Sequence, residues 1–337
     1  KVTEAPTGSI MLGGGYGSYD KLMINGSVSD TNIFGSGLTL SLSGDLSKRS
    51  NRYEIALKNP AINDSDYNGE VEAHSTKIEY RRSHYDSDVK TKGFSVAAGK
   101  EVVRNTYVGA RYGLDFIKEV YNYIPNSNVP INKRFLDQDY TNSSITPYIN
   151  YDSTNDFYFP TAGIKAGASV EYAGVGGDSK YIKPGVNFRY FYSLEDLTEL
   201  DWILRFKTQA KMLIDEGQIN QGDSLYLGGP KTLRGYKSYA FPNNDTGYRD
   251  DPYEKMWSNQ AEISFPLVPS AKMRWGLFYD YGMIGKNSFS EETRSGTGAL
   301  LEWISPMGPL QLIFAKPIGD KPTDDTSSFE FSFGTSF

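Results

Sequence analysis

The sequence predicts an all-β fold: a transmembrane antiparallel β-barrel of about sixteen strands. Apolar and polar residues alternate with a period of two over many stretches of the chain, which is the pattern of strands with one apolar face. Aromatic residues make up 14% of the 337 residues, whereas only 38% are hydrophobic, a poor composition for a large dry core. Strands that face lipid outside and a wet lumen inside are apolar only at every second position, so a membrane barrel accounts for both observations.

The alternation is clearest in the stretch that begins at Trp202. Trp202, Leu204 and Phe206 fall on one face, and Arg205 and Lys207 fall on the other. This stretch continues beyond the usual length of a soluble strand, about 5–6 residues, which argues against a soluble β-sandwich or propeller. Comparable stretches predict strands at 9–17, 21–29, 36–47, 50–58, 68–83, 91–101, 104–120, 143–152, 162–173, 180–193, 200–213, 257–266, 271–284, 296–304, 309–317 and 327–337.

The connections between these strands differ in length. Residues 306–308 form a compact one, whereas 121–142 and 214–256 are long. Outer-membrane barrels have an even number of strands, short periplasmic turns and longer outer loops, and this chain follows that rhythm imperfectly. The longest connection, 214–256, is predicted to fold into the lumen.

Charge and residue types exclude several functions. The net charge of −6 gives no electrostatic reason to bind nucleic acid. The chain has no cysteine and only two histidines, His74 and His84, and it lacks nucleotide-binding glycine loops and the G-x-S-x-G motif. We therefore expect a protein that is not an enzyme, with no catalytic residue, no metal site and no cofactor.

One segment of the longest connection differs from an ordinary loop in composition. Residues 225–239 read LYLGGPKTLRGYKSY. A Gly-Gly-Pro turn at 228–230 is followed, two residues later, by Leu233, Arg234, Gly235 and Tyr236. A free outer loop does not need such a sequence. We expect the segment to fold back into the lumen.

Inside a narrow lumen, Arg234 needs a carboxylate, because an unpaired buried charge is costly. The candidate partners on strands nearby in the sequence are Glu262 and Asp280. The alternative is that Arg234 is exposed on a mobile loop.

Residues 233–236 resemble the Val-Arg-Gly-Phe/Tyr motif of the BamA and two-partner secretion transporter superfamily. Other segments resemble motifs of this superfamily in the same order along the chain, and the resemblance extends from Thr7 to the end. These segments are residues 7–17 for the first barrel strand, 158–163 for Tyr-Phe-Pro-Thr-x-Gly, 278–282 for Phe-x-Asp-x-Gly, and 303–310 for Trp-x-Ser-Pro-x-Gly-Pro-Leu.

The resemblance implies that Arg234 docks against the inner wall, with Asp280 and Glu262 as its partners. It also implies periplasmic POTRA domains ahead of the barrel. We therefore expect residues 1–7 to be the remnant of a linker from those domains and residues 8–337 to form the barrel.

Function is expected at the seam, defined here as the boundary between the first and last strands. Glycine weakens a strand, and three glycines follow one another in the first strand. The alternative is that these glycines only relieve crowding at a barrel corner. The predicted seam residues are Leu12, Gly13, Gly14, Gly15, Phe331, Phe333, Gly334 and Phe337.

The resemblance implies an assembly and insertion factor for β-barrel proteins in the outer membrane of a Gram-negative bacterium. The seam would open sideways, and the first strand would template client strands by β-augmentation. The expected partners are unfolded outer-membrane protein clients, the lipid bilayer, and accessory lipoproteins through the POTRA domains. The alternatives are a two-partner-type polypeptide secretion pore, a passive porin and, last, an enzymatic barrel.

Overall fold

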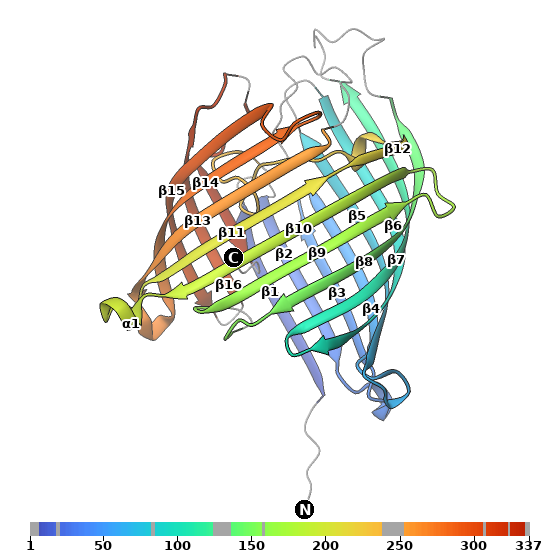
Figure 1. Cartoon of the computed structure of the whole chain (residues 1–337), viewed down its shortest axis with the longest axis horizontal. Helices are drawn as coiled ribbons and strands as arrows, with labels where there is room; N and C mark the ends of the chain where they lie inside the picture. The colour runs from blue at the N-terminus through green and yellow to red at the C-terminus, as the bar shows by residue number, and fades with distance from the viewer. Residues whose placement is uncertain are drawn as a thin grey trace, which may run out of the picture.

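A computed structural model describes residues 7–17, 21–81, 85–123, 136–156, 159–237, 253–305, 308–322 and 324–333. Its strands form a barrel-shaped antiparallel sheet (Figure 1). The strands are β1 Gly8–Gly17, β2 Lys21–Asp30, β3 Thr39–Ser47, β4 Ser50–Asn59, β5 Tyr67–Arg81, β6 Tyr85–Val103, β7 Thr106–Tyr123, β8 Gln138–Asp152, β9 Gly163–Ala173, β10 Lys180–Ser193, β11 Ile203–Met212, β12 Ile214–Gln218, β13 Lys255–Val268, β14 Met273–Gly285, β15 Glu292–Ser305, β16 Gly308–Ile318 and β17 Phe329–Phe333. The helical turns are η1 Ile33–Gly35, η2 Ile62–Asp64, α1 Glu195–Thr198, η4 Gln221–Asp223 and η5 Pro269–Ala271.

Strands that follow one another along the chain pair in an antiparallel meander, apart from β12, which pairs with β10. β11 pairs with β10 on one side and with β13 on the other. β12 continues β11 along β10, where Ile214 pairs with Ile182, and only Leu213 separates the two strands. The described residues form seventeen strands, or sixteen if β11 and β12 are counted as one, which confirms the predicted all-β fold class and the expectation of about sixteen strands.

The bounds of the longest connection need correction. The prediction placed it at 214–256, but residues 214–218 form β12 and β13 begins at Lys255, so the connection is 219–254. β12 has the sequence IDEGQ, which lacks apolar alternation, and all five residues are exposed. It is a strand because β10 offers a pairing edge there, and this cause is not local to its sequence.

The period-two pattern separates the two faces of the wall as predicted. Along β11, Leu204 and Phe206 are 39% and 38% exposed, whereas Arg205 and Lys207 are 3% and 9% exposed. The apolar side chains thus face outward and the charged ones face the lumen, which is the arrangement of a barrel in lipid. Among the helical turns of the described residues, none is long and apolar enough to cross a membrane.

The two ends of the barrel carry different connections. α1 and the first residues of β1 lie at the same end (Figure 1). Antiparallel order places the connections that follow β7 and β12 at the opposite end. These are the two long connections, so the loop that carries the Arg234 segment enters the lumen from the end opposite to the start of β1.

The seam lies between β1 and β17, which are spatial neighbours. β17 pairs with β16 from Phe329 opposite Phe314 to Phe333 opposite Leu310. β1 pairs with β2 over its whole length. Within the described ranges, however, no backbone pair joins β1 to β17.

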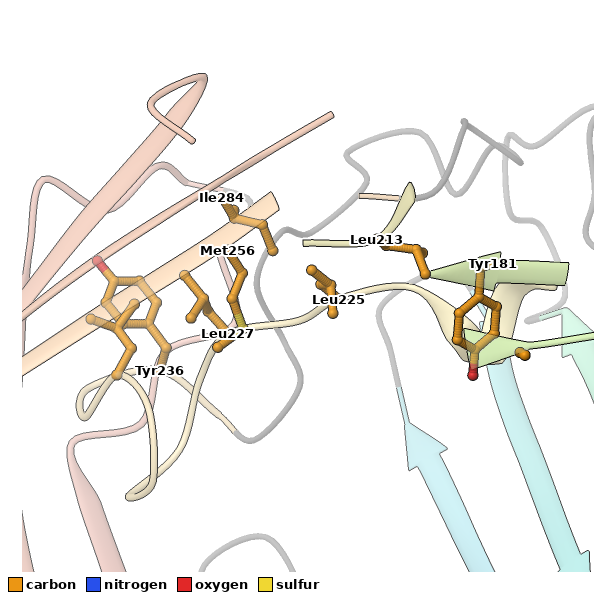
Figure 2. Packing of buried hydrophobic residues seen from close by; sticks show 9 residues of the cluster. Tyr181, Leu213, Leu225, Leu227, Tyr236, Met256 and Ile284 are labelled. Carbon is orange, nitrogen blue, oxygen red and sulfur yellow. The ribbon is translucent and has the colours of Figure 1, made fainter. Parts of the chain in front are cut away.

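The apolar core of the molecule lies inside the lumen. Figure 2 shows Leu225, Leu227 and Tyr236 of the long connection beside Met256 of β13 and Ile284 of β14. The described part of the connection before residue 238 is therefore packed against the inner wall. The whole cluster comprises Ala173, Tyr181, Leu213, Leu225, Leu227, Leu233, Tyr236, Met256 and Ile284.

Candidate functional site: the lumen loop and its docking wall

The part of the long connection that the structure describes before its gap, residues 219–237, is called the lumen loop here. Gly228 and Gly229 have φ of +118° and +83°, values that L-residues with a side chain rarely adopt, so the turn depends on glycine. Thr232 Oγ1 accepts a hydrogen bond from Gly228 N and donates one to Gly228 O, both at 2.9 Å. Gly229 N donates to Tyr236 O at 2.9 Å, which closes the turn and presents Arg234 to the wall.

Arg234 binds Asp280 of β14 in a bidentate manner. Arg234 Nε donates to Asp280 Oδ2 at 2.9 Å and Nη2 donates to Oδ1 at 2.7 Å. The backbone N of Arg234 also donates to Oδ2 at 2.9 Å, so the carboxylate holds both the side chain and the main chain. Both residues are almost fully buried.

Glu262 of β13 is the second carboxylate at Arg234. Arg234 Nη1 donates to Glu262 Oε2 at 2.8 Å, and Arg205 Nη1 donates to Glu262 Oε1 at 2.9 Å. Arg205 continues to Glu302 Oε2 at 2.7 Å. A buried row of alternating charges thus crosses the inner wall, and each member offsets the desolvation of its neighbours. We call Arg234 with Asp280 and Glu262 the Arg234 clamp.

An aromatic ring forms the floor of the clamp. The guanidinium carbon of Arg234 lies 3.7 Å from the centroid of the Phe278 ring. Phe278 is 4% exposed, so this cation–π contact is shielded from water, where such contacts are strongest. Phe278 and Asp280 are alternate residues of β14, so the same face of one strand supplies the ring and the carboxylate.

Polar side chains of the wall also hold the main chain of the lumen loop. Ser258 Oγ donates to Thr232 O at 2.8 Å, Lys207 Nζ donates to Lys231 O at 2.8 Å, and Gln260 Nε2 donates to Pro230 O at 3.1 Å. Sequence reasoning did not identify Lys207, Ser258 or Gln260. The available signal was their position on the polar faces of β11 and β13, next to Arg205 and Glu262.

Two wall glycines give the loop room. A Cβ at Gly296 of β15 would lie 1.9 Å from Arg234 O. A Cβ at Gly282 of β14 would lie 2.9 Å from Leu227 Cδ1. The close approach of the loop backbone to the wall therefore requires glycine at Gly296, whereas a Cβ at Gly282 would make the end of the Leu227 side chain shift.

The start of the lumen loop has its own polar anchor. Asp223 Oδ2 accepts hydrogen bonds from Asn220 N at 3.0 Å and from Ser179 Oγ at 3.2 Å. Burial raises the pKa of the Asp223 carboxyl, although Lys183 and these hydrogen bonds oppose the shift. Beside this anchor, the lumen keeps a cavity of about 520 Å³, whose lining includes Glu171, Lys183 and Lys211.

The predicted site residues thus fall into two places. The structure brings Leu233, Arg234, Gly235 and Tyr236 together with Glu262 and Asp280 inside the lumen. At the seam, Leu12, Gly13, Gly14 and Gly15 belong to β1, and Phe331 and Phe333 belong to β17. Gly334 and Phe337 lie outside the described residues, as do residues 1–6 of the predicted linker, His84, Tyr158 and residues 306–307.

Metal binding finds no support in the described ranges, where no group of three or more His, Cys, Asp or Glu side chains is arranged to hold an ion. The chemistry that the site offers is burial, ion pairing and hydrogen bonding. Such contacts position a loop.

The chain resembles known proteins along its whole length. Outer membrane protein assembly factor BamA of Nitratidesulfovibrio vulgaris is 26% identical over 355 residues, which cover 100% of this chain and 43% of that protein. The same factor of Neisseria meningitidis serogroup B is 24% identical, over 100% of this chain and 48% of that protein. The chain thus spans less than half the length of these curated relatives.

Solved structures share the fold. The crystal structure of BamA from Haemophilus ducreyi lacking POTRA domains 1–3 matches with a TM-score of 0.80 at 23% identity, over 97% of this chain and 70% of that one. CdiB from Acinetobacter baumannii matches with a TM-score of 0.64 at 13% identity, over 96% of this chain and 58% of that one. The barrel is therefore closer in shape to this BamA structure than to this CdiB structure.

These relatives place the chain in the outer membrane of a Gram-negative bacterium. The model of the Omp85 superfamily domain matches residues 32–337, which is most of the barrel and includes the Arg234 clamp. This chain belongs to the Omp85 superfamily.

Proposed function

We propose that this chain assembles and inserts β-barrel proteins into the outer membrane, acting through the seam. The curated relatives that cover the whole chain are outer membrane protein assembly factors, which supports the proposal. The observation that carries it is the edge of β1 that faces β17, for which the described residues show no backbone partner. β1 pairs with β2 over ten residues, but no backbone pair links it to β17 within the part of the chain that the structure describes.

Such an edge can template a client strand. Its N–H and C=O groups offer main-chain hydrogen bonds, and the side chains at alternate positions set the register. Ile10 and Leu12 are 74% and 72% exposed and lie on the apolar face of β1, where a paired client strand would extend the lipid-facing surface. The clients would be unfolded outer-membrane proteins. The step needs no covalent chemistry, because client folding and lipid burial drive it.

In this proposal, the Arg234 clamp holds the inner wall beside the seam in one arrangement. The two carboxylates of the clamp come from β13 and β14. These strands are connected to β17 through β15 and β16 in the sheet. Loss of Arg234 or Asp280 would loosen the lumen loop and impair assembly. Accessory lipoproteins and POTRA domains stay predictions from the family resemblance.

A polypeptide secretion pore is the second candidate. The family resemblance implies this alternative, and the chain also shares its fold with CdiB, although that match has the lower TM-score. In a secretion pore the cargo passes through the lumen, whereas in an assembly factor the client leaves through the seam. A test therefore has to separate the two routes.

The test is a disulfide across the seam. The chain has no cysteine, so Leu12→Cys combined with Phe331→Cys or with Phe333→Cys introduces the only thiols. The full-length protein that carries this barrel is reconstituted in liposomes, and folding of an added client barrel is followed by its resistance to protease. Each single-cysteine variant under the same oxidation is the control.

Oxidation is expected to abolish client insertion in the double variants, and reduction is expected to restore it. Full insertion by an oxidised, cross-linked seam contradicts the proposal. If that locked barrel still exports a soluble polypeptide and a block of the lumen stops the export, the secretion pore replaces the assembly factor.

A further inference from the structure

The lumen loop is joined to the connection between β16 and β17 by backbone pairing. Ser327 N donates to Gly235 O at 2.9 Å, and Lys237 N donates to Asp325 O at 2.9 Å. Between these bonds, Tyr236 and Thr326 form an antiparallel bridge. Two short segments, 235–237 and 325–327, thus make a small ladder inside the barrel, and it begins at the residue after Arg234.

The β16–β17 connection is itself fixed to the wall by an ion pair. Arg294 of β15 donates to Asp324 through Nε at 2.5 Å and through Nη2 at 3.1 Å. The side chains of Arg294 and Asp324 are only 4% and 3% exposed. Lys321 N adds a hydrogen bond to Asp324 Oδ2 at 2.8 Å. A bidentate pair without water around it holds one geometry, so the ladder has a fixed base.

The ladder leads directly into the last strand. Ser328 follows Ser327 of the ladder, and its O accepts a hydrogen bond from Ala315 N of β16 at 3.0 Å. β17 begins at the next residue, Phe329. Only one residue, Ser328, therefore separates Phe329, the first residue of β17, from Ser327, which is hydrogen-bonded to Gly235.

Among the described residues, the other backbone restraints on β17 come from β16. Its described pairing with β16 covers five residues, and its other edge has no described backbone pair with β1. Inside the lumen, Glu330 is 5% exposed, and its Oε2 has no hydrogen-bond partner among the described residues. The ladder therefore adds a second backbone restraint, beside that of β16, immediately before the start of this strand.

We propose that the ladder is a strut through which the Arg234 clamp sets the position of β17 at the seam. Arg294 and Asp324 are its positioning residues. When the strut is intact, β17 stays against β16. When the ladder or its base is broken, the β17 segment is released while the rest of the wall keeps its pairing. This inference rests on the proposed function, since it assigns a regulator to the same seam.

The experiment is hydrogen–deuterium exchange on the full chain in lipid nanodiscs. Asp324→Asn removes the carboxylate charge from the Arg294–Asp324 ion pair that fixes the ladder to the wall. The matched control is Asp201→Asn, because Arg274 donates to Asp201 Oδ2 at 2.7 Å and to Asp201 O at 2.7 Å near the opposite end of the barrel. In Asp324→Asn, exchange of the β17 amides is expected to accelerate about tenfold, the loss expected for one charged hydrogen-bonded pair. The amides of β13 and β14 stay slow, and Asp201→Asn leaves β17 unchanged.

A disulfide in the ladder keeps the test decisive if Asp324→Asn does not fold. Lys237 and Asp325 are cross-strand partners whose exposed ion pair contributes little, so Lys237→Cys with Asp325→Cys is a mild change. Oxidation is expected to slow β17 exchange relative to the reduced form. In the Asp324→Asn background, oxidation is expected to restore the wild-type rate.

Equal β17 exchange in wild type and Asp324→Asn overturns the strut, and so does equal exchange in the oxidised and reduced double-cysteine variant. The readout does not involve a client. The two proposals can therefore fail separately. If the seam disulfide does not block client insertion but Asp324→Asn speeds up β17 exchange, the proposed function is refuted and the strut is supported. The reverse combination refutes the strut alone.

Discussion

Arg234 is the residue on which the lumen loop depends most. It donates four hydrogen bonds to two carboxylates and lies over an aromatic ring, and all of these groups are buried. Removing one partner of such a group leaves the other charges buried and uncompensated, which is far more costly than the loss of an exposed pair. The planar, bidentate geometry also means that lysine is not an equivalent replacement.

Arg234→Gln is therefore expected to lower the free energy of unfolding by about 3–5 kcal/mol, the usual cost of breaking a buried ion pair. The control is Arg52→Gln, because Arg52 pairs with Glu54 at 2.7 Å but its side chain is 48% exposed. There we expect about 1 kcal/mol or less. Urea unfolding in lipid vesicles, followed by tryptophan fluorescence, measures both. Equal losses for the two variants would show that Arg234 is not held in a buried pair.

The strands could be predicted from the sequence because each needs only its own alternation. β11 shows this well, since Arg205 and Phe206 already indicate which face of the strand is turned to the lumen and which is turned to lipid. β12 could not be predicted, because its residues become a strand only through the free edge of β10. The hydrogen bonds of Lys207, Ser258 and Gln260 to the lumen loop could not be predicted for a related reason. The period of two shows that these side chains face the lumen, but only the three-dimensional arrangement of the strands and the loop shows which loop carbonyls they contact. The ladder of Tyr236 with Thr326 joins two loops, and no local pattern encodes it.

At the level of elements, β15 lets the lumen loop lie close to the wall because Gly296 has no side chain. Gly296→Ala places a methyl group where Arg234 O lies, so the loop has to move away from β15. Gly113→Ala on β7 is the matched control, because the nearest atom to its added Cβ would be 3.9 Å away. We expect faster exchange of the lumen-loop amides and a loss of about 1–3 kcal/mol in the first variant, as for an overpacked core. The second variant is expected to change stability by about 0.5 kcal/mol or less. Indistinguishable variants would mean that the loop does not rest on Gly296.

At the scale of the molecule, described segments of the chain occupy part of the lumen and leave a cavity beside them. The lumen loop and the β16–β17 connection occupy the side of β13 to β17. The cavity of about 520 Å³ lies among β5 to β11 and the first part of the loop. A barrel of this size is therefore not an empty tube, and its passage for ions is narrowed by its own chain.

In planar bilayers the wild-type barrel is accordingly expected to show small and unsteady conductance, not the steady large steps of a passive porin. Arg234→Gln is expected to enlarge the steps, because the released loop no longer obstructs the lumen. Arg52→Gln again serves as the control and is expected to resemble wild type. Steady, large steps from the wild-type protein would favour the porin alternative over both other functions.

The position of the Arg234 clamp also constrains the order in which the barrel itself can fold. Arg234 precedes its partners Glu262 and Asp280 in the chain by 28 and 46 residues. Its carbonyl then lies against Gly296, and the 325–327 segment pairs beside it, so the last three strands are built around a loop that is already inside. A sheet that closed first would have to admit a buried arginine and its apolar neighbours through the open end. Biogenesis of this barrel is therefore expected to begin with the hairpin of β13 and β14 around the loop and to end with the strands beside the seam.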